Sequence, residues 1–97
     1  MSVTNRVAEK IRLAQGRRMG PDGILRLVAD EEELDKLSAA TFKEAQAQKF
    51  LSYLKSITIN NTLGPGASNE ELRHLEGQRY LVAIIERRIE NGRNQTA

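Results

Sequence analysis

Residues 68–92 read SNEELRHLEGQRYLVAIIERRIENG and carry the strongest structural signal in the chain. Their apolar residues recur at intervals of three, four or seven, which is typical of an amphipathic helix with a wide apolar face. Ser68 and Glu71 have the spacing of a capping box, in which each side chain accepts a hydrogen bond from the other residue's backbone N–H. Gly92 is placed to end the helix in a left-handed conformation. We therefore predict a helix over residues 69–91, whose apolar face must be buried.

A second amphipathic helix precedes this one. Thr41 and Glu44 have the spacing of a further capping box, and the apolar pattern after them predicts a helix over residues 42–59. The segment between the two helices, residues 60–67, is rich in asparagine, glycine and proline, which favour turns. Two long helices joined by a short loop are expected to pack as an antiparallel helical hairpin over residues 42–91.

The apolar faces of this hairpin supply the candidate core. The second helix has more apolar surface than a two-helix hairpin can bury, so the excess must pack on the first half of the chain or on another subunit. Gly77 weakens this helix, and we expect close approach of a neighbouring backbone or of a bulky side chain, such as Tyr53 or Phe50, to compensate. Four side chains are expected in the core or at a subunit interface: Phe50, Leu54, Val82 and Ile85.

The amino-terminal part is predicted to add one or two shorter helices. An apolar stripe in residues 3–15 predicts a first helix, and an acidic first turn predicts another over residues 30–37. The apolar run at residues 24–28 is short enough to be strand or helix; we favour a helix, because the sequence shows no second strand for it to pair with. The chain is therefore expected to be one small all-α domain over residues 1–97, with a loose polar tail at residues 93–97.

Composition narrows the classes of function. The chain has no cysteine and a single histidine, His74, so disulfides, thiolate metal sites and histidine-pair metal sites are excluded. Glu70 and His74 share a helix face, but a catalytic or metal site would need a third group. Neither of the glycine-rich turns matches a phosphate-binding loop. We expect a protein that is not an enzyme and that has no cofactor, metal or small-molecule substrate.

The net charge is only +2, but the charges are grouped along the chain. A basic segment, residues 1–20, is followed by an acidic block at residues 30–35, and the two could neutralise each other within the fold or between neighbouring copies. Contact with nucleic acid through residues 6–18 is an open alternative. Arg87 and Arg88 are interpreted as part of a mixed polar face. We expect partner contacts at four basic side chains: Arg6, Lys10, Arg17 and Arg18.

The predicted helical hairpin resembles a known group of proteins. Its first helix carries Phe50, Tyr53 and Leu54, and its second opens with NEELRHLEGQR, residues 69–79. This combination resembles the small helical-hairpin accessory proteins of tailed-phage structural modules, and the resemblance covers residues 42–91. It implies a non-catalytic accessory component of a phage particle or of its assembly.

Three classes of function follow from these observations. The excess apolar surface, the opposed charge blocks and the resemblance favour a structural or assembly protein that acts through protein–protein contacts, in multiple copies. The alternatives are a small nucleic-acid-binding or regulatory protein that uses the basic amino-terminal helix, and an inhibitor of a host enzyme. No apolar run has the length of a signal peptide or a membrane-spanning helix, so we expect no membrane contact. The expected location is the cytoplasm or, for a phage component, the virion.

Overall fold

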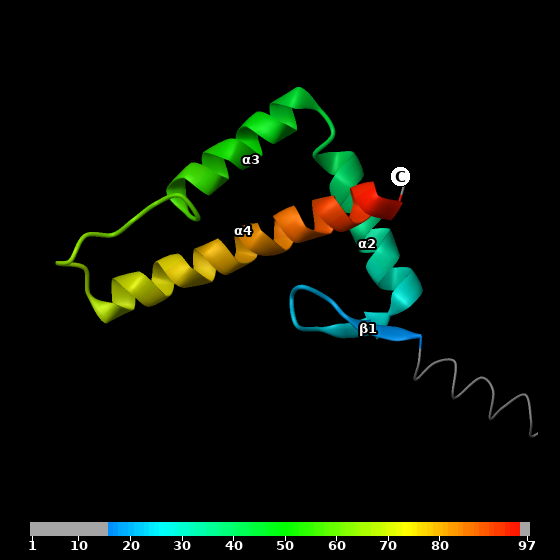
Figure 1. Ribbon diagram of the computed structural model, residues 1–97, viewed down its shortest axis with the longest axis horizontal. Coiled ribbons are helices and arrows are strands. Elements are labelled where there is room, and N and C mark those ends of the chain that lie inside the picture. Colours follow the sequence, from blue (N-terminus) through cyan, green and yellow to red (C-terminus); the bar gives the residue numbers. More distant parts are fainter. Residues whose placement is uncertain (1–15, 96–97) are drawn as a thin grey trace, which may run out of the picture.

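The computed structural model describes residues 16–95, which form two short strands and three helices (Figure 1). The described part of the chain is mostly helical, as predicted, and two of its helices run antiparallel across a connecting loop. The elements in chain order are β1 (Arg17–Met19), β2 (Leu25–Leu27), α2 (Val28–Thr41), α3 (Ala45–Ile57) and α4 (Asn69–Gln95).

The two strands form an antiparallel hairpin at the amino-terminal end of the described chain. Arg18 lies opposite Arg26, and Met19 lies opposite Leu25. The prediction of a helix over residues 24–28 is wrong, because this run does have a partner strand. That partner contains two adjacent arginines, so its sequence lacks the alternation of apolar and polar residues that identifies a strand.

A tight turn joins the strands and sets their register. The backbone N–H of Gly20 donates to Ile24 O at 3.0 Å, and Gly23 has a φ of 81°, a conformation that favours glycine. The Asp22 side chain accepts a hydrogen bond from the backbone N–H of Ile24 at 2.9 Å. This hydrogen bond holds Asp22 at the turn, from which its other carboxylate oxygen reaches α4.

Helix α2 is longer than the predicted helix over residues 30–37, because it follows β2 directly and continues to Thr41. The prediction that Thr41 and Glu44 form a capping box is wrong. Thr41 is the last residue of α2, and its hydroxyl donates to Leu37 O at 2.8 Å. Helix α3 begins at Ala45, with Glu44 as its N-cap residue and no side-chain capping bond.

The most extensive helix contact is between α2 and the carboxy-terminal half of α4 (Figure 1). The prediction that Gly92 ends α4 is wrong, since the helix continues to Gln95. Gly92 is buried where the two helices cross, and a Cβ atom added there would overlap Asp35 O and lie 2.7 Å from Ala39 Cβ. Glycine is therefore required at this position by the close approach of α2.

Helix α4 begins largely as predicted. The backbone N–H of Glu71 donates to Ser68 Oγ at 3.1 Å, and Ser68 Oγ donates to Glu71 Oε1 at 3.2 Å. Three residues at seven-residue intervals, Leu75, Val82 and Ile89, are its buried hydrophobic side chains. They line one side of α4 along most of its length, and α3 contacts α4 far less than α2 does.

Two glycines of α4 lie in opposite environments and give a matched test of this packing. Replacing Gly92 by alanine should lower the free energy of unfolding by about 1–3 kcal/mol, because the added methyl group overlaps α2. Replacing Gly77 by alanine should raise it by about 1 kcal/mol, because the added Cβ would have no neighbouring atom within 4 Å and alanine favours the helix. The expectation that Tyr53 or Phe50 approaches Gly77 is therefore wrong. Urea unfolding measures both effects, and a stabilising Gly92→Ala substitution would contradict the close helix crossing.

Candidate protein-interaction surface

Arg88 on α4 is buried among three carboxylates. Its Nη1 atom lies 2.9 Å from Glu31 Oε2 and 3.0 Å from Asp35 Oδ1. Its Nη2 atom lies 3.3 Å from Asp22 Oδ2. Glu31 and Asp35, both on α2, are completely buried, and Arg88 is only 7% exposed. This guanidinium group therefore ties α4 both to α2 and to the turn between the strands.

Two arginines of the β-hairpin complete the cluster. Arg26 Nη1 lies 2.6 Å from Glu31 Oε1, and Arg26 Nη2 lies 2.8 Å from Asp22 Oδ2. Arg18 Nη2 lies 3.1 Å from Asp35 Oδ2. Three guanidinium groups thus face three carboxylates, and their formal charges cancel. These six residues are called the Arg88 cluster: Arg18, Asp22, Arg26, Glu31, Asp35 and Arg88.

The hydrogen bonds of the cluster stabilise the charged forms of its members. The bond from Arg88 is the largest influence on the pKa of Glu31 and lowers it; burial opposes this effect, and Arg26 lowers the pKa further. The pKa of Asp22 is also well below its usual range, chiefly because Arg26 donates to its carboxylate. The bond to Glu31 raises the pKa of Arg88. Asp22, Glu31 and Arg88 are therefore ionised at neutral pH.

The arrangement of the Arg88 cluster suits holding secondary-structure elements in place rather than catalysing a reaction. Each carboxylate of the cluster accepts hydrogen bonds from guanidinium groups. Among residues 16–95, no buried side-chain nitrogen or oxygen lacks a partner, and no group of three or more His, Cys, Asp or Glu side chains is arranged to hold a metal ion. The cluster therefore acts as an ionic clamp between the β-hairpin, α2 and α4.

The interpretation of Arg88 as part of a mixed polar face is wrong, because its side chain is buried. Its neighbour Arg87 is exposed, and Arg87 Nη1 lies 3.9 Å from Glu90 Oε2. The sequence contained one signal for this difference. Ile84 lies four residues before Arg88 and Gly92 four residues after it, so Arg88 shares its helix face with an apolar residue and a glycine. An arginine on such a face, in a chain with an acidic block elsewhere, is a candidate for a buried ion pair.

The basic residues predicted as partner contacts lie in different settings. Arg6 and Lys10 are outside the described residues. Arg17 is exposed on β1. Arg18 is paired with Asp35, so one charge of the basic segment is neutralised by the acidic block within the fold. Arg18 is exposed as well, so among residues 16–95 Arg17 is the member of this set that is exposed and makes no ion pair.

The residues predicted for the core or an interface also differ in burial. Val82 is buried on α4, and Leu54 and Ile85 are half-buried. Phe50 is 58% exposed, so α3 does not direct this ring into the core of the single chain.

Helix α3 presents apolar side chains to solvent. Phe50, Tyr53 and Ile57 follow one another at intervals of three and four residues, which places them on one helix face, and they are 58%, 55% and 45% exposed. The Phe50 and Tyr53 rings contact each other, with centroids 5.9 Å apart. Phe50, Tyr53 and Ile57 are called the α3 ridge. It is an apolar surface in which two of the three side chains are aromatic.

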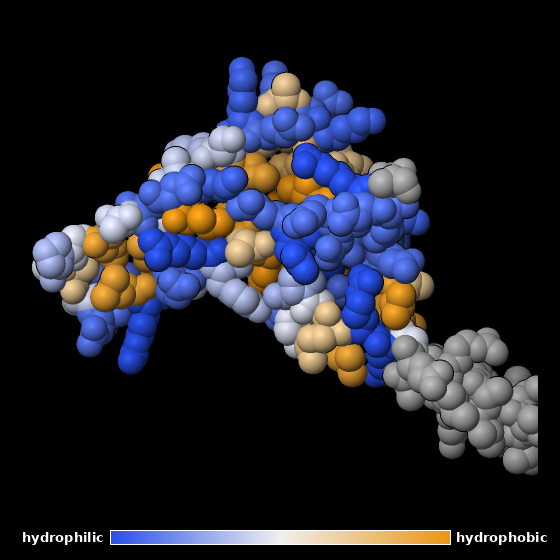
Figure 2. Space-filling model, viewed as in Figure 1, coloured by the Kyte–Doolittle hydropathy of each residue, from blue (hydrophilic) through white to orange (hydrophobic). Residues whose placement is uncertain are grey.

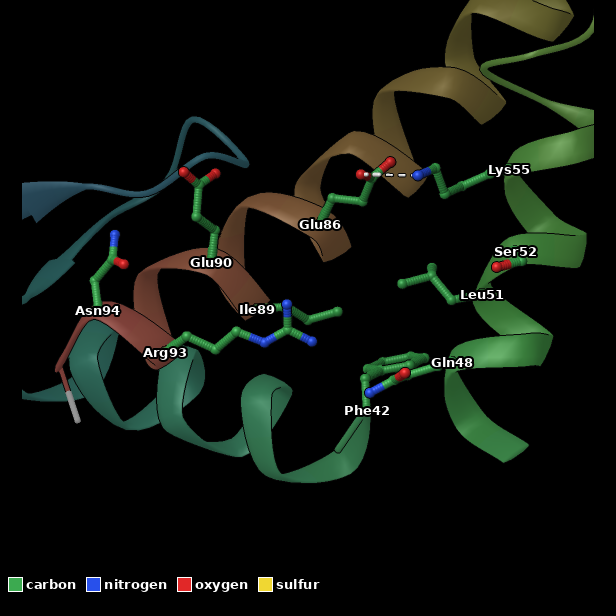
Figure 3. Close-up of a pocket in the computed structure, with 10 residues that line it drawn as sticks. All are labelled: Phe42, Gln48, Leu51, Ser52, Lys55, Glu86, Ile89, Glu90, Arg93 and Asn94. Carbon is green, nitrogen blue, oxygen red and sulfur yellow. Dashed lines mark ion pairs between the residues drawn. The ribbon is translucent and has the colours of Figure 1, made fainter. Parts of the chain in front are cut away.

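A cleft of about 450 Å³ lies between α3 and the carboxy-terminal half of α4. Figure 3 shows Leu51 on α3 and Ile89 on α4 pointing into this cleft from opposite sides. An ion pair spans it, with Lys55 Nζ 3.5 Å from Glu86 Oε2. The cleft shows that α3 stands partly away from the rest of the molecule along its inner side.

The far end of α3 is held by one arginine of α4. Arg79 Nε donates to Thr58 O at 2.9 Å, and its Nη2 group donates to Asn61 O. Thr58 is buried, and its hydroxyl donates to Leu54 O at 2.6 Å. The carboxy-terminal end of α3 is therefore anchored, although the outer face of the helix is not covered.

Apolar side chains also reach the surface elsewhere. Met19 and Leu25, which lie opposite each other on the β-hairpin, are 60% and 52% exposed. Figure 2 shows hydrophobic residues at the surface both beside α3 and near the hairpin. Within residues 16–95, no helix has the length and apolar character needed to span a membrane.

Comparison with known proteins identifies one family. The model of the family described as Bbp19-like phage protein matches residues 38–95, which is more than half of the chain. The matched region contains the end of α2 and all of α3 and α4. It includes the segment over which the sequence resembles phage hairpin proteins. Searches of curated proteins and of solved structures found no match.

The burial of Arg88 predicts a large difference between two neighbouring arginines. Arg88→Met should lower the free energy of unfolding by about 3–5 kcal/mol, because it leaves buried carboxylates without their partner. Arg87→Met should change it by less than about 1 kcal/mol, because Arg87 makes only an exposed pair. Urea unfolding compares the two variants. Equal effects would show that the cluster does not hold the helices together.

The low pKa of Glu31 and of Asp22 predicts loss of stability in acid. Each carboxyl has a lower pKa in the folded chain than in the unfolded chain, so its stabilising contribution is complete at neutral pH and is lost as the pH falls. The free energy of unfolding should begin to fall at about pH 5 and continue to fall at lower pH. Urea unfolding between about pH 3 and pH 7 measures this dependence. A free energy of unfolding that does not change over this range would contradict the conclusion that ionised carboxylates hold the β-hairpin, α2 and α4 together.

Proposed function

We propose that this chain, which belongs to the Bbp19-like phage protein family, is a non-enzymatic structural or assembly component of a phage particle. It acts through protein–protein contacts and in several copies. The family supplies the phage context. The region that matches the family also contains the α3 ridge, which is the surface best suited to bind another protein.

The exposure of the α3 ridge is the observation that carries this proposal. Large contiguous apolar patches on a protein surface commonly mark binding sites. Exposed aromatic side chains such as Phe50 and Tyr53 are also the usual energetic centres of protein interfaces. Complete burial of each such side chain contributes about 1.5–3 kcal/mol. A partner that covers the ridge would therefore gain substantial free energy.

The attachment of α3 also favours a binding role. The Arg88 cluster fixes α2, the β-hairpin and the second half of α4 relative to one another. In contrast, α3 is held mainly at its far end by Arg79 and across the cleft by the ion pair between Lys55 and Glu86. A helix held in this way can adjust its position when a partner binds, while the rest of the molecule keeps its shape.

The chemistry of the described residues is consistent with a role that does not involve catalysis. His74 is exposed on α4, and one of its ring nitrogens lies 3.2 Å from Gln78 Nε2. Glu31 lines a hollow of about 380 Å³ beside the β-hairpin, but its carboxylate is bound by Arg26 and Arg88, and that of Asp35 is bound by Arg18 and Arg88. We therefore propose that this chain binds a partner and has no acid–base catalytic site.

The alternative functions use other surfaces or other partners. Nucleic-acid binding would use the basic amino-terminal segment, of which Arg18 is already paired with Asp35. This pairing leaves less positive charge for phosphates, so we rank nucleic-acid binding below protein binding. An inhibitor of a host enzyme would use the same α3 ridge, with the enzyme in place of another particle component.

Substitution of the α3 ridge tests the proposal. The wild-type protein should associate at about 1 M salt, where the Debye length is roughly 3 Å and exposed ion pairs contribute little. The double variant Phe50→Ser, Tyr53→Ser should raise the dissociation constant of this association at least about tenfold, because burial of both rings is lost. Light scattering coupled to gel filtration measures the mass.

Leu81→Ser is the matched control, because Leu81 is 60% exposed on α4 and lies outside the ridge. It should associate like the wild type. A wild-type protein that stays monomeric at high salt would contradict the assignment of the ridge as the contact. So would a Leu81→Ser variant whose dissociation constant rises as much as that of the ridge variant. Release of bound nucleic acid by salt, with a steep salt dependence, would instead favour the nucleic-acid alternative.

A further inference from the structure

A basic hollow of about 500 Å³ lies where the carboxy-terminal ends of α2 and α4 meet the start of α3. Lys36 comes from α2, Lys43 from the connection to α3, and Arg93 from the last turn of α4. The small residues Ala39 and Gly92 form part of its wall and leave it open. Among the described residues that line the hollow there is no carboxylate. Its chemistry is therefore that of a site for negatively charged groups.

The two lysines of the hollow are available to a partner. Neither Lys36 nor Lys43 makes an ion pair with any residue in the range 16–95. By contrast, the buried acids of α2 are already bound by arginines, so they cannot turn toward the hollow. Both lysine side chains are exposed, which leaves them accessible from solvent.

The opposite end of α4 has the complementary charge. Its first turn contains Glu70 and Glu71, both exposed, and Glu70 has no ion pair with the described part of the chain. Figure 1 shows this turn at the far end of the molecule from the crossing of α2 and α4. With a rise of about 1.5 Å per residue, roughly 35 Å of continuous helix separates Glu70 from Arg93. The acidic turn and the basic hollow of one molecule therefore cannot meet.

We propose that the acidic first turn of α4 in one copy of this chain docks into the basic hollow of the next copy. This inference rests on the proposed function in several copies and names one contact between them. The contact joins different surfaces, so successive copies form a ring or a filament.

The contact is weak for a single pair of molecules. Exposed ion pairs each contribute little, so we expect a dissociation constant of about 1 mM and a strong dependence on salt. It gains strength only when many copies are held together in a particle, since each further contact is then formed at high effective concentration. The test must therefore be done at high protein concentration and at about 0.01 M salt, where the Debye length is roughly 30 Å.

Two variants made on the Phe50→Ser, Tyr53→Ser background isolate this contact from the α3 ridge. The hollow variant carries Lys36→Gln and Lys43→Gln, and the turn variant carries Glu70→Gln and Glu71→Gln. Glutamine at position 71 keeps the capping interaction with Ser68, so α4 should still begin normally. Circular dichroism checks that both variants keep the helix content of the parent.

Sedimentation equilibrium gives a distinctive result if the proposal holds. The parent should form species larger than two chains at low salt, and each variant alone should raise the dissociation constant at least about tenfold. An equimolar mixture should form pairs and stop at twice the chain mass, because one intact turn meets one intact hollow and no further ends can join. A parent that stays monomeric at low salt, or a mixture that stays monomeric or grows beyond two chains, overturns the proposal.

Control variants with the same loss of charge exclude a general electrostatic effect. Asp30→Asn with Glu33→Gln removes two exposed acids of α2, and Lys49→Gln with Arg17→Gln removes two exposed cations outside the hollow. Both controls should associate like the parent, and loss of association in either would overturn the proposal. The α3 ridge is tested with the wild-type protein at high salt, whereas the hollow is tested with the Phe50→Ser, Tyr53→Ser parent at low salt. If the wild type associates at high salt but the parent stays monomeric at low salt, the proposed function stands and this inference fails.

Discussion

The buried guanidinium of Arg88 is the constraint on which the rest of this small structure depends. Glu31 and Asp35 are completely buried, and buried charges cost several kcal/mol each unless opposite charges and hydrogen bonds compensate. The compensating arginines come from β1, β2 and α4, so the β-hairpin, α2 and α4 must all be in place at once. Gly92 makes this possible, because it lets α2 approach α4 one helical turn beyond Arg88.

This concentration of contacts at one end of α4 leaves the other elements less covered. Leu75, Val82 and Ile89 form a narrow buried line along α4, and α3 adds little to it. The aromatic side chains of α3 therefore remain at the surface, which a single chain with so small a core cannot avoid. A protein that works in an assembly can use that surface, because its partners supply the missing burial.

Much of the helical part could be predicted from the sequence, because its signals are local. The Ser68 cap and the apolar period of α4 identified the longest helix, and the motif at residues 69–79 pointed to the correct family. Apart from the capping box at Thr41, which failed for a local reason, the wrong predictions concern contacts between distant residues. Gly92 looked like a helix stop because its neighbour α2 is far away in sequence, and Arg88 looked exposed because its partners lie more than fifty residues earlier. The strand at residues 17–19 was hidden because its two adjacent arginines break the apolar and polar alternation of a strand, and one of them, Arg18, binds in that same cluster.

Hydrogen exchange followed by mass spectrometry tests the central claim most directly, namely that the Arg88 cluster fixes one rigid body and leaves α3 free for a partner. It should be measured below and above the concentration at which the protein associates. The account predicts slow exchange in α2 and in the second half of α4 under both conditions, with fast exchange in α3 that slows on association. Exchange in α3 as slow as in α2 at low concentration, or unchanged when the protein associates, would contradict it.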